Sequence, residues 1–340
     1  MAHDWEPRLQ AFVTGAGGLV GVHLLNALCR EGCQITALSR RHSLADDLIE
    51  ASDKLRFISG DVQDPGLLWS ILTSQSFDVI FHLAALNAFA DAIDLYRVNV
   101  VGTATLLEAV RRLERPELKL IVMGSSAEYG NSADDPIDEG SALAPVTYYG
   151  ASKACADLMG KALFGETGQK VICARPFNIL GPGQRGPLLP AAITRQLVDI
   201  VQGRRPPILE VGDLSNYRDY VDARDVAEGL ILLARRGVAG EAYNLCSGRA
   251  TQAKFIVEHL VGLTAVPVTL QTKARTQAPV NIRYQRGSAE KARESLGWSP
   301  KIPLEQSLSD MLTFCRAQAL ADDLAADRAH ANPKPESRGQ

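Results

Sequence analysis

Short apolar runs alternate with longer amphipathic stretches through the first half of the chain. The predicted strands lie at residues 11–14, 34–38, 55–58, 79–83, 120–123 and 171–174, and the predicted helices at 20–30, 65–73, 95–113 and 148–164. The strand runs are nearly continuous in apolar residues, which is typical of strands buried on both faces. This alternation predicts an α/β fold, a Rossmann-type doubly wound parallel sheet with helices on both faces.

The pattern changes after residue 175, where prolines and glycines crowd residues 176–190 and 203–207. Predicted helices follow at residues 191–201, 223–234, 255–262 and 304–317, with short strands between some of them. This half is too interrupted for a second regular sheet, and it predicts a smaller mixed α/β lobe packed on the first. We therefore expect a dinucleotide-binding domain at 9–175, a substrate lobe at 176–317 that interleaves with it, and a flexible tail at 318–340.

Composition excludes several classes of protein. The chain has 340 residues and a formal net charge of −3, without the basic excess of a nucleic-acid binder. No apolar window is long enough for a membrane span, and the first residues lack the pattern of a secretory signal. The six cysteines form no C-x-x-C pair and the six histidines show no metal-ligand spacing, so we expect no metal site and a reduced, cytoplasmic protein. His82 lies in a strand run and is expected in the core.

A glycine-rich turn, Thr14-Gly-Ala-Gly-Gly-Leu-Val-Gly21, joins the first predicted strand to the first helix. Glycine is needed where such a turn is tight and where its backbone approaches a pyrophosphate, and the helix N-terminus offers N–H groups to the phosphates. The strand before and the helix after favour a dinucleotide site over a simple turn. The expected contacts are Gly15, Gly17, Gly18, Leu19 and Val20.

The end of the second strand carries Arg40 and Arg41 where an NAD-selective site has an acid, and no acid occurs between Glu31 and Asp46. Because guanidinium groups bind phosphate and a carboxylate would repel it, we expect NADP(H) rather than NAD(H), with Arg40 on the 2′-phosphate. A solvated arginine pair on a loop is the alternative.

Residues after the third and fourth strands complete the predicted cofactor site. Asp61 and Val62 are placed to meet the adenine, and Leu83 to Ala85 to line the middle of the cofactor.

Tyr149 and Lys153 lie four residues apart, on one face of a predicted helix. The ammonium is expected to lower the pKa of the phenol, which then exchanges a proton with a substrate oxygen while a hydride moves at the nicotinamide. Ser126 follows the fifth strand, at the edge of the sheet where ligands bind, and is expected to hydrogen-bond the same oxygen. An isolated pair of this spacing is also common in helices without chemistry.

The glycine turn, the serine and the Y-x-x-x-K pair together resemble the extended short-chain dehydrogenase/reductase family over about residues 9–317. The second half is most similar to GDP-6-deoxy-4-keto-D-mannose reductases and GDP-mannose 4,6-dehydratases, through the segments 175–184, 209–213, 218–222, 243–248 and 298–303. The resemblance implies that Asn178 and Arg218 bind a nucleotide-sugar, that Pro176 and Ile179 border the nicotinamide, and that the helices at 95–113 and 148–164 pair in a homodimer. A surface ion pair with Asp219 or Asp222 is the alternative for Arg218.

The chain departs from these relatives at one position. Where they carry an arginine that grips the diphosphate, this sequence has Ala278, so that Arg275 or Arg283 substitutes or the diphosphate is held differently.

Three functions remain open at this point. The first is an NADP(H)-dependent reductase of a nucleotide-linked 4-keto-6-deoxy-hexose, with Tyr149 as the proton donor. The second is a 4,6-dehydratase or an epimerase; a dehydratase needs a carboxylate beside the serine, and Glu128 is the candidate acid–base, although this segment is one residue shorter than in the dehydratases. The third is a regulatory protein that binds NADP without catalysis.

Overall fold

The computed structural model describes residues 9–40, 49, 52–272 and 282–331. Its centre is a seven-stranded sheet in which every neighbouring pair of strands is parallel. The strands are β1 (Gln10–Thr14), β2 (Gln34–Ser39), β3 (Leu55–Ser59), β4 (Val79–His82), β5 (Lys119–Met123), β6 (Val171–Pro176) and β10 (Ala242–Leu245). Their spatial order is β10-β6-β5-β4-β1-β2-β3, so the chain reverses direction across the sheet beside β1. This is the switch point at which doubly wound sheets bind ligands.

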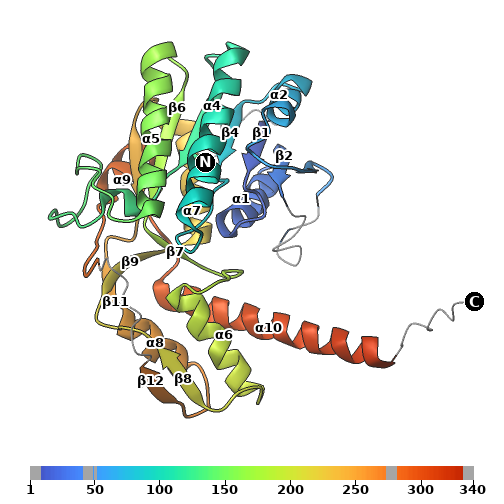
Figure 1. Ribbon diagram of the computed structural model, residues 1–340, viewed down its shortest axis with the longest axis vertical. Coiled ribbons are helices and arrows are strands. Elements are labelled where there is room, and N and C mark those ends of the chain that lie inside the picture. The colour runs from blue at the N-terminus through green and yellow to red at the C-terminus, as the bar shows by residue number, and fades with distance from the viewer. Residues whose placement is uncertain (1–8, 41–48, 50–51, 273–281, 332–340) are drawn as a thin grey trace, which may run out of the picture.

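Helices cover both faces of this sheet, as predicted (Figure 1). They are α1 (Leu19–Arg30), α2 (Pro65–Ser74), α3 (Ala92–Leu95), the π-helical η2 (Tyr96–Val101), α4 (Gly102–Leu113), α5 (Tyr148–Thr167), α7 (Ala223–Arg236) and α9 (Glu290–Leu296). Residues of β1 alternate between two cores: Ala11 and Val13 pack in the cluster that contains α1 and α7, and Phe12 in the cluster that contains α2 and α4. The continuous apolar run of this strand therefore serves two faces.

The remaining elements form a smaller lobe, seen in the lower part of Figure 1. Its strands are β7 (Asn178–Leu180), β8 (Ile208–Val211), β9 (Tyr217–Asp222), β11 (Ala250–Gln252) and β12 (Thr269–Thr272), and its helices are α6 (Leu189–Val201), α8 (Ala253–Gly262) and α10 (Leu304–Ala331). β9 pairs with β7 in parallel and with β11 antiparallel, while β8 and β12 form a separate pair. The helices α6, α8 and α10 share one apolar cluster.

The two halves of the chain interleave, since α7 packs on α1 and β10 pairs with β6 at the edge of the main sheet. The segment from residue 318, predicted as a tail, is helical as far as Ala331, because α10 continues to that residue. The segment is rich in alanine and contains no glycine or proline before residue 333, so its helix propensity is high. Within the described part of the chain, no helix is long and apolar enough to cross a membrane.

Candidate active site

The glycine turn between β1 and α1 has the close approaches that its sequence predicts. Gly15 adopts a φ of +69°, and a Cβ there would lie 2.5 Å from the backbone nitrogen of Ala84. A Cβ on Gly21 would lie 2.5 Å from the Gly15 carbonyl oxygen. Gly18 is the N-cap of α1 and provides no side-chain hydrogen bond to the first turn. The free N–H groups of that turn are therefore available to an anion. This cradle fits the pyrophosphate of a dinucleotide.

The other predicted cofactor residues lie at the same edge of the sheet. Arg40 is exposed directly after β2, Val62 is buried, and Leu83 and Ala85 follow β4. The Asp61 carboxylate accepts the backbone N–H of Gln63 at 2.9 Å, which organises the turn after β3. Gly17, Leu19 and Ile179 are half-buried and Val20 is buried, while Arg41 lies outside the described residues.

Tyr149 lies in the first turn of α5, which begins after the N-cap Thr147. Burial raises the pKa of the Tyr149 phenol, a hydrogen bond from the Ser125 side chain acts in the opposite direction, and the charge of Glu128 raises it further. We predicted that Lys153 lowers the pKa of Tyr149. That prediction is wrong, because burial has the largest effect and raises this pKa. The phenol is protonated at neutral pH.

Ser125, and not Ser126, is the hydroxyl beside Tyr149. The 3₁₀-helix η3 (Ser126–Tyr129) starts directly after Ser125, so that Ser126 turns into the protein and its Oγ donates to Gln285 Oε1 at 3.2 Å. The prediction of Ser126 as the substrate-binding serine is one position off. A signal was present in the sequence: Ser125 and Glu128 form an S-x-x-E capping box, in which Ser125 Oγ accepts the Ala127 N–H at 3.2 Å.

Lys153 lies one turn after Tyr149 on α5, as predicted. It is buried, and its Nζ donates to the Met123 carbonyl oxygen at the end of β5 at 2.5 Å. Burial lowers the pKa of Lys153 to about 8, and the negative charge of Glu128 opposes that effect. The two N–H groups of the ammonium that Met123 does not occupy are available to a ligand.

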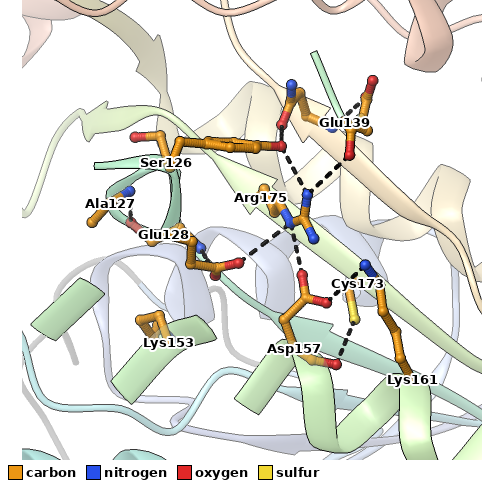
Figure 2. A network of polar contacts seen from close by, with 12 residues as sticks. Ser126, Ala127, Glu128, Glu139, Lys153, Asp157, Lys161, Cys173 and Arg175 are labelled. Atoms are coloured by element: carbon orange, nitrogen blue, oxygen red, sulfur yellow. Dashed lines mark hydrogen bonds and ion pairs between the residues drawn. The ribbon is translucent and has the colours of Figure 1, made fainter. Parts of the chain in front are cut away.

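Glu128 is withdrawn from the site (Figure 2). Its side chain has no exposed surface; Oε1 accepts the Ser125 N–H at 2.7 Å, and Oε2 lies 3.3 Å from Arg175 Nε. A carboxylate held in this way does not reach a substrate, so the prediction of Glu128 as a catalytic acid–base is wrong.

Arg175 is the centre of the buried polar network in Figure 2. Its Nε donates to Asp157 Oδ2 at 2.7 Å, and its Nη1 donates to the Tyr129 hydroxyl at 2.9 Å. Tyr129 in turn donates to Asn244 Oδ1 at 2.7 Å. The network joins β6 and β10 of the main sheet to α5 and η3, and so ties the base of the site to these elements.

The predicted substrate residues lie on the lobe side. Asn178 is half-buried in β7, and its amide donates to the Asp219 carbonyl oxygen at 3.1 Å. Arg218 Nη1 donates to the Tyr217 carbonyl oxygen at 2.8 Å, and no described carboxylate lies within ion-pair distance of its guanidinium. The Asp219 carboxylate instead binds the N–H groups of Ser247, Gly248 and Gly287. The alternative of an ion pair for Arg218 is therefore wrong.

Arg283, one candidate for the missing diphosphate arginine, is exposed, and its carbonyl oxygen accepts the Tyr217 N–H at 2.8 Å. It is therefore next to the strand that carries Arg218. Arg275 and Ala278 lie outside the described residues.

His82 is a core residue, as predicted. Thr103 Oγ1 donates to the Asn99 carbonyl oxygen at 2.6 Å, so His82 Nε2 donates to Thr103 and Nδ1 accepts from Thr14 Oγ1 at 2.8 Å. Burial lowers the pKa of His82 to about 3, and the ring is neutral. The residues that the structure describes contain no group of His, Cys, Asp and Glu arranged to hold a metal ion.

Comparison with known proteins agrees with this geometry. The family model of GDP-mannose 4,6 dehydratase matches residues 12–311. GDP-6-deoxy-D-mannose reductase from Pseudomonas aeruginosa is 32% identical over 308 residues, which cover 89% of this chain and 95% of that protein. UDP-glucose 4-epimerase from Halalkalibacterium halodurans is 28% identical over 86% of this chain and 90% of that protein.

Among solved structures, that of RMD from Pseudomonas aeruginosa complexed with NADPH superposes with a TM-score of 0.79 at 29% identity, covering 91% of this chain and 99% of that chain. The chain therefore belongs to the GDP-mannose 4,6 dehydratase family and is a nucleotide-sugar-modifying oxidoreductase of the extended short-chain dehydrogenase/reductase type.

Proposed function

We propose that this enzyme is an NADP(H)-dependent reductase that converts a nucleotide-linked 4-keto-6-deoxy-hexose, such as GDP-6-deoxy-4-keto-mannose, to the 4-hydroxy sugar. The observation that carries the proposal is the arrangement of Ser125, Tyr149 and Lys153 after β5, at the same edge of the parallel sheet as the glycine turn after β1, with the Glu128 carboxylate withdrawn from the site. The similarity to the reductase from Pseudomonas aeruginosa supports the choice of substrate class.

NADP(H) is the proposed cofactor. The cradle of Gly15 and Gly18 would hold the pyrophosphate, and the exposed Arg40 would bind the 2′-phosphate. Asp61 and Val62 would border the adenine, and Leu83, Ala85 and Ile179 the middle and the nicotinamide end. When bound, the reduced nicotinamide supplies a hydride to the carbonyl carbon of the sugar. The NADPH complex of the similar reductase structure supports this assignment.

The chain's own residues manage the proton. Tyr149 is protonated at neutral pH and donates its hydroxyl proton to the C4 oxygen as that oxygen gains charge. The Ser125 Oγ accepts the Ala127 N–H, so its own hydrogen is directed elsewhere and can orient the same substrate oxygen. Lys153 binds the ribose and holds a positive charge one helical turn from the phenol. General acid catalysis of this kind contributes about 10²–10⁴-fold.

A dehydratase needs a carboxylate that reaches carbon atoms C5 and C6 of the sugar. Glu128 is fully buried, and Ala127 before it has no acidic side chain, so this segment offers no such base. The geometry therefore favours the reductase over the dehydratase. The epimerase is the second candidate, because a UDP-glucose 4-epimerase is also similar along most of the chain. A regulatory protein without catalysis does not need Ser125, Tyr149 and Lys153 together in one site.

Asn178 and Arg218 are the proposed contacts of the nucleotide-sugar. Arg218 is half-buried on β9 with no carboxylate partner among the described residues, so its charge is available for a diphosphate. Arg283 is a second proposed cation for that group.

We also propose that two copies of the chain form a homodimer through α3, η2, α4 and α5. Large apolar side chains are exposed on three of these elements: Ile93 on α3, Tyr96 and Val101 on η2, and Tyr148 and Leu158 on α5. Light scattering coupled to size exclusion tests this: a mass of one chain at micromolar concentration contradicts the dimer.

The decisive assay follows NADPH oxidation with GDP-6-deoxy-4-keto-mannose as substrate, with the Tyr149→Phe variant as control. Stoichiometric NADPH loss with formation of the 4-hydroxy sugar supports the reductase. Conversion of GDP-mannose to the keto sugar without net NADPH loss would instead show a dehydratase. Interconversion of UDP-glucose and UDP-galactose without NADPH loss would show an epimerase.

A further inference from the structure

The carboxylate of Glu128 holds the residue that bears the candidate catalytic hydroxyl. Its Oε1 accepts the backbone N–H of Ser125 at 2.7 Å, while Ser125 Oγ accepts the N–H of Ala127 at 3.2 Å. Gly124 leaves the space for this contact, because a Cβ at that position would collide with Oε1. The backbone after β5 is therefore built around the Glu128 side chain.

The second oxygen of Glu128 is incompletely neutralised. Oε2 lies 3.3 Å from Arg175 Nε, but that N–H donates to Asp157 at 2.7 Å, and Oε2 accepts no hydrogen bond from any described residue. Asp157 is also 3.3 Å from Lys161 Nζ. Arg175 thus serves mainly Asp157, and Glu128 Oε2 is left without a hydrogen-bond donor among the described residues.

The neighbours of Glu128 include the proposed acid–base residues on α5. Burial raises the pKa of Glu128 to about 8, with Asp157 acting in the same direction and Arg175 and Lys153 in the opposite direction. The ionised carboxylate raises the pKa of Lys153 against the effect of burial, and it also raises the pKa of Tyr149. The Tyr129 hydroxyl accepts from Arg175 Nη1 and belongs to the same network.

We propose that Glu128 is a positioning residue of this active site, whose buried carboxyl group anchors the backbone of Ser125 and whose ionisation is linked to that of Lys153. The role deepens the proposed function, because it concerns the residues assigned there. It replaces the idea of Glu128 as a base that touches the sugar.

Glu128→Gln separates charge from anchoring, since the amide oxygen can still accept the Ser125 N–H. Loss of the negative charge removes the group that opposes the effect of burial on Lys153. The titration midpoint of Lys153, followed by NMR of ¹³Cε-labelled lysine and assigned with Lys153→Met, is expected to fall below that of the wild type. This measurement uses the whole chain with NADP⁺ absent and then present, and it needs no substrate.

Glu139→Gln is the matched control. Glu139 also accepts a backbone N–H, that of Asn244 at 2.7 Å, and belongs to the same network, but it is not among the groups that act on Lys153. Its variant is expected to leave the Lys153 midpoint unchanged. An unchanged or raised midpoint in Glu128→Gln, or an equal shift in both variants, overturns the proposal.

Glu128→Asp tests the anchor and serves if the glutamine variant does not fold. It keeps the charge but shortens the reach to Ser125, so the Lys153 midpoint is expected to stay near that of the wild type. If the enzyme reduces the keto sugar, kcat is expected to fall about tenfold or more with little change in KM, because the Ser125 hydroxyl is misplaced. A midpoint that falls as in Glu128→Gln contradicts the proposal. Absence of reductase activity in the wild type contradicts only the proposed function, since the titration is read without substrate.

Discussion

Gln285 holds Ser126 by two hydrogen bonds, from Ser126 Oγ to its Oε1 at 3.2 Å and from its Nε2 to the Ser126 carbonyl oxygen at 3.0 Å. Ser126 begins η3, just after the central strand β5, whereas Gln285 lies 159 positions later in the chain. Both are buried. The Ser126 hydroxyl, which the sequence suggested as the substrate contact, is therefore bound to Gln285. Ser125 is the serine that faces Tyr149.

Alanine substitution of each serine is expected to give different results. Ser125→Ala removes a hydroxyl at the reacting oxygen and is expected to lower kcat about 10²-fold, as loss of one such donor does in other enzymes. Ser126→Ala is expected to leave kcat within about threefold and to cost about 1 kcal/mol of unfolding free energy, the usual loss for one hydrogen bond. Steady-state kinetics and urea unfolding of both variants measure this. A larger loss of kcat in Ser126→Ala would restore the original assignment.

Arg40→Asp is expected to change the choice of cofactor. An aspartate at the end of β2 would repel a 2′-phosphate and could accept hydrogen bonds from a free ribose. The KM for NADPH is expected to rise about tenfold or more, while the KM for NADH stays the same or falls. Fluorescence titration of both cofactors provides a check that does not depend on turnover. Equal effects on the two cofactors would show that Arg40 is a solvated surface residue.

Arg175→Leu is expected to destabilise the protein strongly. It leaves Asp157 and Glu128 as buried carboxylates without their common cation, and breaking a buried ion pair on one side costs about 3–5 kcal/mol. Burial alone would raise the pKa of Asp157, and it is the hydrogen bond and charge of Arg175 that lower it. Equilibrium unfolding in urea measures the loss. A change of less than about 1 kcal/mol would mean that the network is dispensable.

His82 is expected to make stability fall in mild acid. The pKa of His82 is about 3 in the folded protein against an ordinary value of 6.5, because burial disfavours the charged ring. Its contribution is therefore present above pH 6.5 and is lost as the pH falls from there towards 3, since only the unfolded chain binds the proton. This one group is expected to cost about 2 kcal/mol between pH 7 and pH 5. Urea unfolding of His82→Gln checks this, as its stability should fall less over the same pH range than that of the wild type.

Several features could be derived from the order of residues alone. The alternation of apolar runs and amphipathic stretches predicts the parallel sheet, because period and length decide whether a segment suits a strand or a helix. Glycine at position 15 specifies a turn that other residues could not form, given its φ of +69°. The spacing of Tyr149 and Lys153 places both on one side of a single helix. These are local properties, set by the residue and its near neighbours.

The direction of a side chain was decided only by tertiary packing. Ser125 and Ser126 are identical and adjacent, and the difference between them depends on where η3 begins and on Gln285, which is distant in sequence. Glu128 likewise follows the serine pair at a position where the sequence suggested an acid–base. The contact with Arg175 and the space left by Gly124 place its carboxyl group inside the protein instead. Burial then outweighs the hydrogen bond of Ser125 in setting the pKa of Tyr149. Desolvation depends on every atom that surrounds a group, and no local pattern of residues contains that information.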